Sequence, residues 1–329
     1  MTSILPFIRA YQTYFPAVID RRECKIFETG TDSICAIILA YWKTQQKGAH
    51  TVWFPRHFCG QTLSRIRNIL SSLGYEANIN LYDTDTDLFD LSFEGNDVLI
   101  WVHFNRYTAI SDVIRRELKC RDVFLLEDFV LASFDICKVV GDAAINSLRK
   151  ISPLNISLAY SSMPLESYEP SSAYAELRRN AAWKKTVFEI IPEEQLENEF
   201  LQCFKNAEEI LEGRQNIHCP VTEDLLLFER IDWEKILELR RSNYHVLHNR
   251  LSLTEETIVP GEYQYLMLKL NERDSIRKKL FDVGIYAPVH WLDSHSYLKN
   301  SLLSIPIDQR YNASDMFGVA DFLTNLWQA

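Results

Sequence analysis

The sequence predicts an α/β fold in which a mainly parallel sheet flanked by helices is followed by a smaller α+β domain. Short apolar runs rich in Val, Ile and aromatic residues alternate with longer segments of helical periodicity through the first half, which is typical of βαβ units. From about Ser171 the sequence becomes charged and favours helices. The length of 329 residues is enough for two domains, and we place their boundary between residues 228 and 229.

Four apolar runs in the first half predict buried strands, and three periodic segments predict helices. The strands are expected at Thr51 to Phe54, Asn78 to Tyr82, Val98 to Val102 and Val123 to Leu126. The helices are expected at Asp32 to Gln46, Gln61 to Leu73 and Ser111 to Lys119. Ligands of such sheets bind at the carboxyl ends of the strands, so the residues that follow each run are the first candidates for a site. These candidates are Pro55 to Cys59, Asp83, His103 to Asn105 and Asp128.

The second half predicts a long connecting helix over Asp232 to Leu251, whose apolar residues could share one stripe. A strand is expected over Tyr263 to Leu270, followed by helices over Asp274 to Asp282 and Ala313 to Trp327. Together these segments predict a compact α+β domain spanning residues 229–329, after a large domain spanning residues 1–228.

Composition and charge exclude several classes of protein. The net charge of -10 provides no global positive field that would attract nucleic acid or an anionic membrane surface. The longest strongly apolar stretch, Ile34 to Trp42, is shorter than a membrane helix, and the N-terminal residues lack the pattern of a signal peptide. The seven cysteines are scattered and never spaced as CxxC, which fits reduced thiols. We therefore expect a cytoplasmic protein without a nucleic-acid or membrane partner.

Several common motifs are missing or incomplete. The sequence contains no GxGxxG, Walker, GxSxG or HExxH motif. The acidic stretch from Asp83 to Glu94 imitates a calcium loop but has Leu88 where the turn needs glycine, so a solvated loop is expected. The histidine pairs His245 with His248 and His290 with His295 have no evident third ligand, so we expect no metal site.

The segment from Ser147 to Lys150 has three interpretations. It matches the SxxK motif of penicillin-recognising serine enzymes, although the KTG element is absent. It could instead be an exposed basic pair, Arg149 and Lys150, after a strand. The third interpretation includes Asp128, which follows an apolar strand 22 residues before Lys150. A lysine amine and a carboxylate are what pyridoxal phosphate (PLP) chemistry requires, because the amine binds the cofactor and the carboxylate keeps the pyridine nitrogen protonated.

Short segments along nearly the whole chain, in the same order, resemble the fold-type I PLP-dependent aminotransferases of the DegT/DnrJ type. These segments are TGTDS at 29–33, TVWFPRHFCG, LYDTDTDLFDL, WVHFN, LLEDF, GDAAINSLRK, RRSNYHVLHNRL, RKKLFDVGIYAPVHW and LSIPIDQRYNASDM. The SLRK tetrapeptide is similar to that of one subgroup. The resemblance implies a large domain with a mainly parallel seven-stranded sheet, a small C-terminal domain and a homodimer with its active site at the interface.

The resemblance also implies roles for individual residues. Lys150 would form the imine with PLP, and Asp128 would pair with the pyridine nitrogen. The other expected cofactor contacts are Gly30, Thr31, Asp32, Phe58, Cys59, Ser147 and Arg149, and those expected near the substrate are His103, His290, Trp291, Arg310 and Tyr311. The implied function is transfer of an amino group from a small-molecule donor, usually glutamate, to a nucleotide-linked keto-sugar in surface polysaccharide biosynthesis.

The sequence departs from the family's pattern at several positions. Leu131 replaces the Gln or His that can bond the cofactor's phenolic oxygen, and Cys59 stands where many relatives have an aromatic residue. Arg106 replaces a glycine, and ISPLNIS replaces a glycine-containing proline loop. These changes support an alternative, a catalytically silent relative that serves as a binding or scaffold protein. Dehydratase relatives have histidine at the position of Lys150, which argues against that reaction. The sequence does not identify the substrate or the amino donor.

Overall fold

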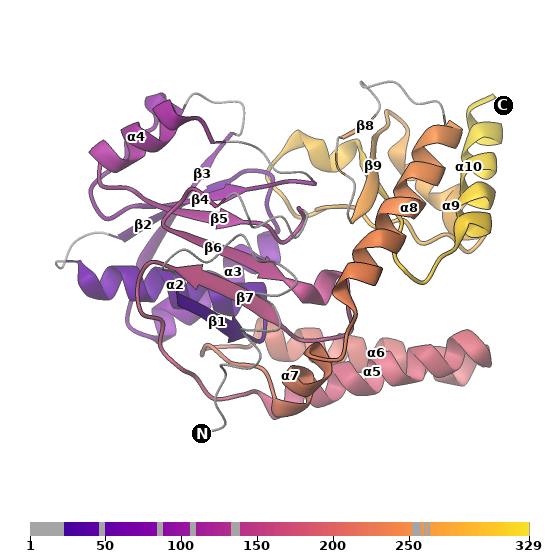
Figure 1. The fold of residues 1–329 in the computed structure, drawn as a ribbon, viewed down its shortest axis with the longest axis horizontal. Helices are drawn as coiled ribbons and strands as arrows, with labels where there is room; N and C mark the ends of the chain where they lie inside the picture. The colour runs from indigo at the N-terminus through magenta and orange to yellow at the C-terminus, as the bar shows by residue number, and fades with distance from the viewer. Residues whose placement is uncertain are drawn as a thin grey trace.

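The computed structural model describes residues 23–45, 50–83, 88–105, 110–132, 139–251, 258–259, 261 and 264–328. Its larger sheet has seven strands in the order β1-β7-β6-β5-β4-β2-β3 (Figure 1). Strands β2 to β6 run parallel to one another, whereas β7 is antiparallel to both β1 and β6. The strands are β1 Glu23–Phe27, β2 His50–Pro55, β3 Ala77–Tyr82, β4 Val98–Val102, β5 Phe124–Asp128, β6 Ala143–Ser147 and β7 Ser157–Ser161. The predicted mainly parallel sheet is confirmed.

Helices cover both faces of this sheet, as the alternation of side chains along β4 shows. Val98 and Ile100 belong to the core cluster that includes α2 (Gly30–Thr44) and α3 (Gly60–Ser72). Leu99, which points to the opposite face, packs in a cluster with Leu118 of α4 (Asp112–Cys120). Helices α2 and α3 therefore cover one face and α4 the other, and the carboxyl ends of the parallel strands meet at one edge.

The four predicted strands and three predicted helices of the first half form, with ends shifted by a few residues. Strands β1, β6 and β7 were missed by the apolar-run criterion. The buried residues of β6 and β7 include the polar Asn146 and Ser157, so these strands do not form continuous apolar runs. The Ser157 hydroxyl donates a hydrogen bond of 2.9 Å to the Asn146 carbonyl, which allows it to be buried. Of the acidic stretch that imitates a calcium loop, Asp85 and Asp87 lie outside the described residues, as do Arg106 and Cys137.

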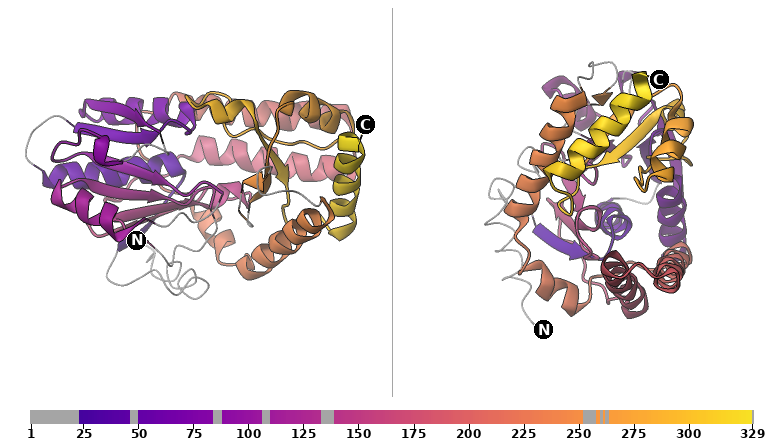
Figure 2. Two further views of the ribbon diagram at one scale, coloured as in Figure 1. Left: turned by 90° about the horizontal axis from the view of Figure 1, so that it is seen from above. Right: turned by 90° about the vertical axis from the view of Figure 1, so that its right-hand side faces the viewer.

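The sheet is followed by a helical hairpin and a smaller α+β unit. Helices α5 (Ser172–Ile190) and α6 (Glu194–Glu212) pack side by side along their length (Figure 2). A three-stranded antiparallel sheet follows in the order β10-β9-β8. The remaining elements are α7 Thr222–Phe228, α8 Trp233–Leu251, β8 Ile258–Val259, β9 Tyr265–Lys269, α9 Arg273–Asp282, β10 Leu302–Pro306 and α10 Ala313–Gln328.

Helix α8 connects the two sheets, as the long periodic segment predicts. Its apolar stripe is shared between two cores: Trp233 packs in a cluster with strands of the large sheet, whereas Tyr244, Leu247 and Leu251 pack with the small sheet. The boundary at residues 228 and 229, which falls between α7 and α8, stays a prediction. No helix among the described residues is long and apolar enough to cross a membrane.

Candidate active site

A cavity of about 330 Å³ lies at the carboxyl edge of the large sheet. The ends of β4, β5 and β6 contribute Val102, Asp128 and Ser147 to its lining, and the segment after β2 contributes Phe58 and Cys59. Ten of the residues expected to contact the cofactor or the substrate line this cavity. They are Gly30, Thr31, Phe58, Cys59, Asp128, Ser147, Arg149, Lys150, His290 and Trp291.

The beginning of α2 forms one wall of the cavity. Thr29 caps the helix, because its hydroxyl accepts a hydrogen bond of 3.2 Å from the Asp32 amide. Gly30 and Thr31 follow and line the cavity. Free backbone N–H groups and the helix dipole make such a start favourable for an anion.

Asp32 itself turns away from the cavity. Its carboxylate accepts hydrogen bonds from Arg214 Nη1 and from the His218 amide, both at 3.0 Å, and it is fully buried. Arg214 also pairs with Glu28, and its guanidinium lies 4.8 Å from the centre of the Tyr174 ring. Asp32 therefore fixes the beginning of α2 from behind and is not among the lining residues.

Asp128 places one buried carboxyl group in the cavity at the end of β5. Its Oδ1 accepts a hydrogen bond of 2.8 Å from the Val130 amide. Burial raises the pKa of Asp128 to about 6, against the opposing effects of this hydrogen bond and of the charge on Lys150. The second oxygen accepts no hydrogen bond from any described residue, so it is available to a ligand.

Lys150 and Arg149 lie in a short 3-10 turn after β6, so both side chains reach the cavity. Burial, followed by the charge of Arg149, lowers the pKa of Lys150 to about 8. Near neutral pH this lysine therefore holds more neutral, nucleophilic amine than an ordinary lysine does. Arg149 donates a hydrogen bond of 2.5 Å to the Tyr174 hydroxyl, and its side chain is 18% exposed. The interpretation as an exposed basic pair is therefore wrong.

An aromatic wall closes the cavity from the side of the small sheet. The Trp291 ring lies 6.0 Å from that of Phe58, beside Cys59. Asp293 holds this segment in place, because its Oδ2 accepts a 2.8 Å hydrogen bond from the Gln61 amide in the first turn of α3. A Cβ at Gly60 would lie 2.8 Å from that oxygen, so glycine allows the approach.

The sequence analysis missed two charged residues in the lining, Arg65 of α3 and Glu208 of α6. Glu208 Oε2 lies 2.9 Å from Arg65 Nη2, and its Oε1 lies 3.7 Å from Arg149 Nη1. Although burial opposes ionisation, the charges of Arg149 and Arg65 hold the pKa of Glu208 below its ordinary value. One signal was available: Glu208 lies between the buried Ala207 and Leu211, on a face that periodicity marks as apolar.

Three other residues expected near the substrate lie outside this lining in the described part of the chain. His103 is completely buried, with Nε2 2.8 Å from Glu127 Oε2. Glu127 also accepts hydrogen bonds from the Val140 and Gly141 amides, so it joins β5 to the segment before β6. Arg310 lines a neighbouring cavity, and Tyr311 packs against the core of the small sheet.

The described residues contain no group of three or more His, Cys, Asp or Glu side chains that could hold a metal ion. His290 instead contacts the Ser304 hydroxyl through Nδ1 at 2.9 Å. Burial, together with the charges of Lys150 and His57, lowers the pKa of His290 to about 3, so its ring is neutral.

No model of a protein family matches the sequence, and neither does any curated protein. Solved structures, however, match the fold. DesV from S. venezuelae, in complex with a ketimine intermediate, has a TM-score of 0.63 at 13% identity, covering 98% of this chain and 89% of DesV. A DegT DnrJ EryC1 StrS aminotransferase from Brucella abortus has a TM-score of 0.60 at 12% identity, with coverages of 98% and 91%.

DesI, solved in the presence of its TDP-sugar product, has a TM-score of 0.62 at 12% identity, with coverages of 97% and 84%. Likeness at this level of identity defines the fold. The chain has the fold of the fold-type I PLP-dependent aminotransferases, as the sequence resemblance predicted.

Proposed function

We propose that this protein is a PLP-dependent aminotransferase that acts on a nucleotide-linked keto-sugar. The observation that carries this proposal is the meeting of Lys150, Asp128 and the beginning of α2 in one cavity, although they come from distant parts of the sequence. DesV and DesI, which share the fold, were solved with a ketimine intermediate and a TDP-sugar product, respectively. This likeness supports the class of reaction and of acceptor.

The residues present fit PLP. The N–H groups at Gly30 and Thr31, the Ser147 hydroxyl and the Arg149 guanidinium would hold its phosphate, because they combine a helix start with a fixed positive charge. The available Asp128 oxygen would face the pyridine nitrogen, and Lys150 would bind the aldehyde carbon. When bound, the cofactor supplies an electron sink for the substrate carbanion.

The protein's own part in the reaction is to hold and move protons in a buried site. Lys150 Nζ would take a proton from the substrate carbon that bears nitrogen, acting as base, and would later give a proton back, acting as acid. The Asp128 carboxylate would hold the protonated pyridine nitrogen. Trp291 and Phe58 limit the access of water on one side of the cavity.

Borohydride reduction in the presence of PLP, followed by peptide mapping, tests the cofactor assignment. We expect a pyridoxyl group on Lys150, and none in Lys150→Ala. Lys43→Ala is the control, since Lys43 is an exposed lysine paired with Glu166. An adduct of equal yield in Lys150→Ala would refute the assignment. Loss of the cofactor absorbance on addition of glutamate would then establish transfer of the amino group.

A second candidate is a ligand-binding relative without turnover, because the cavity wall holds the apolar Leu131 where a hydrogen-bonding residue is expected. Cofactor trapped on Lys150 without reaction with any amino donor would favour it. We also propose that the protein is a cytoplasmic homodimer with its active site at the subunit interface. Light scattering on the purified protein measures the oligomeric state.

A further inference from the structure

A second cavity, of about 350 Å³, lies beside the candidate active site and shares Arg149 and Lys150 with it. Five segments form its walls: residues 149–153 after β6, helix α5, Phe204 of α6, Arg240 of α8 and residues 308–310 after β10. Its lining contains six basic side chains and only two carboxylates. The basic residues are Arg149, Lys150, Arg178, Lys185, Arg240 and Arg310, and the carboxylates are Glu189 and Asp308.

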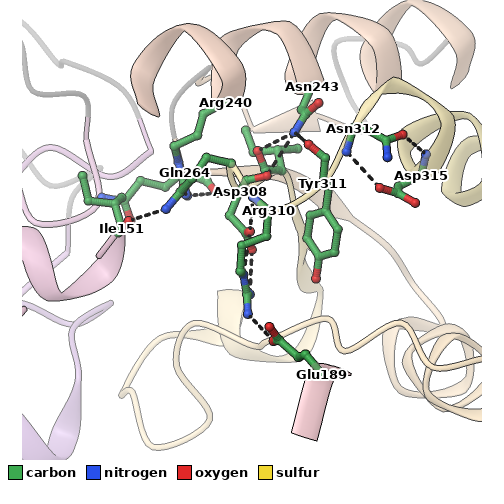
Figure 3. A network of polar contacts seen from close by, with 12 residues as sticks. Ile151, Glu189, Arg240, Asn243, Gln264, Asp308, Arg310, Tyr311, Asn312 and Asp315 are labelled. Carbon is green, nitrogen blue, oxygen red and sulfur yellow. Dashed lines mark hydrogen bonds and ion pairs between the residues drawn. The ribbon is translucent and has the colours of Figure 1, made fainter. Parts of the chain in front are cut away.

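Arg310 forms ion pairs with both carboxylates of this lining, those of Asp308 and Glu189. Its Nε and Nη2 contact Asp308 at 2.9 and 3.0 Å, and its Nη1 contacts Glu189 of α5 at 3.1 Å (Figure 3). Arg240 donates instead to two neutral acceptors, Gln309 Oε1 at 2.8 Å and the Gln264 carbonyl at 3.0 Å. Arg149 lies 3.7 Å from Glu208, which is outside this lining. Arg178 and Lys185 are therefore left without a carboxylate partner in the described residues, although the chain as a whole carries -10.

Arg178 and Lys185 are seven residues apart on α5, two turns of one helix face. Neither side chain forms a hydrogen bond or ion pair with any described residue, and Arg178 Nε is buried without a partner. The guanidinium of Arg178 lies 4.8 Å from the centre of the Phe204 ring, which holds it over α6. Burial and the neighbouring Arg149 lower the pKa of Arg178, and burial with Arg310 lowers that of Lys185. Such crowding of like charges is unfavourable unless an anion binds among them.

We propose that this cavity binds the diphosphate of the nucleotide-linked acceptor, an inference that rests on the function proposed above. A single carboxylate, such as that of an amino donor, would satisfy one arginine, whereas a diphosphate can accept from several fixed guanidinium groups at once. Because Lys150 borders both cavities, a substrate anchored here by its diphosphate would present its sugar to the reacting amine. Helix α5 would thus supply acceptor specificity from within one chain.

Titration calorimetry with inorganic pyrophosphate tests the proposal on the full chain incubated with PLP. We expect Arg178→Ala and Lys185→Ala each to weaken pyrophosphate binding about tenfold or more, since each removes a charge-assisted contact. Lys184→Ala is the matched control, because this lysine lies next to Lys185 on α5 but pairs with Glu199 of α6. The Lys184→Ala variant should bind pyrophosphate with the same affinity as the unchanged protein. Added salt should weaken pyrophosphate binding to the unchanged protein and to each variant.

Undetectable pyrophosphate binding, or equal affinity in all three variants, would overturn the proposal. Arg178→Ala also removes the contact with Phe204, so Lys185→Ala alone decides the result if the arginine variant unfolds. Borohydride trapping on Lys150, run in parallel, separates the two levels of inference. Trapping without pyrophosphate binding refutes only the diphosphate site, whereas selective pyrophosphate binding without trapping supports an anion site and refutes the PLP function.

Discussion

Arg214 Nη1 donates a hydrogen bond of 3.0 Å to Asp32 Oδ2, joining residues 182 positions apart in the chain. The same guanidinium pairs with Glu28 and lies over the Tyr174 ring, whose hydroxyl accepts from Arg149 in the active-site cavity. This buried network therefore connects the beginning of α2 with Arg149, the two groups to which we assign the cofactor phosphate.

Replacement of Arg214 should be strongly destabilising. Arg214→Met leaves the buried carboxyl groups of Glu28 and Asp32 without the guanidinium that they contact, and we expect a loss of about 3 kcal/mol or more in the free energy of unfolding. Urea denaturation measures it. Arg250→Met is the control, because its pair with Asp321 is more than half exposed and should contribute less than about 1 kcal/mol. Equal losses in the two variants would contradict this view of the network.

The same network predicts a pH dependence of stability. Burial raises the pKa of Glu28 from 4.5 to about 8, despite the opposing charge of Arg214. The folded protein thus retains a proton that the unfolded chain has lost, so stability should fall as pH rises from 4.5 to 8. Unfolding free energies at several pH values measure the slope, which should be smaller in Glu28→Gln. An unchanged slope in that variant would assign the titration to another group.

Asp128→Asn removes the charge but keeps the shape of the side chain. We expect Lys150 to bind PLP still, but the reaction with an amino donor to slow by about 100-fold or more, because the fixed charge that supports the electron sink is lost. Stopped-flow absorbance measures the rate. Asp321→Asn, at an exposed carboxylate, provides the control. A rate within a few-fold of the unchanged protein would remove Asp128 from the proposed role.

The lowered pKa of Lys150 predicts when it reacts. Only the neutral amine attacks the cofactor aldehyde, so the rate of PLP attachment should rise with pH and level off above a midpoint of about 8. An ordinary lysine would continue to gain reactivity up to its value of 10.5. Absorbance at the cofactor band, followed after mixing at a series of pH values, measures the midpoint. A midpoint near 10.5 would mean that burial does not control this amine.

Leu131→Gln tests the most conspicuous departure from the family pattern. Leu131 is 2% exposed and lines the cavity, so the amide should destabilise the cofactor-free protein by about 1 to 3 kcal/mol. With PLP bound, the amide can donate to the phenolic oxygen, so part of this loss should be recovered and the absorbance maximum should shift. Leu131→Met, which offers no donor, should shift neither quantity. Identical spectra for both variants would place position 131 away from that oxygen.

Local pattern was sufficient for much of the fold. Apolar runs and helical periodicity located β2 to β5, α2 to α4 and the connecting helix α8, because these elements bury continuous apolar faces. The same criterion missed β6 and β7, where Asn146 and Ser157 are buried but hydrogen-bonded. The end of the strand predicted at Val123 to Leu126 led to Asp128, whereas the SxxK motif and the resemblance led to Lys150.

The sequence by itself thus determined the α/β class, most of the sheet and ten residues that line one cavity. Only the tertiary structure decided which polar residues face that cavity: Asp32 and His103 come from the expected segments but bond behind it, to Arg214 and Glu127. It also brought Arg178 and Lys185 of α5 next to Arg310, more than 120 residues later. Periodicity reports how a segment folds on itself, whereas the meeting of distant charges depends on how helices and sheets pack against one another, which no short pattern contains.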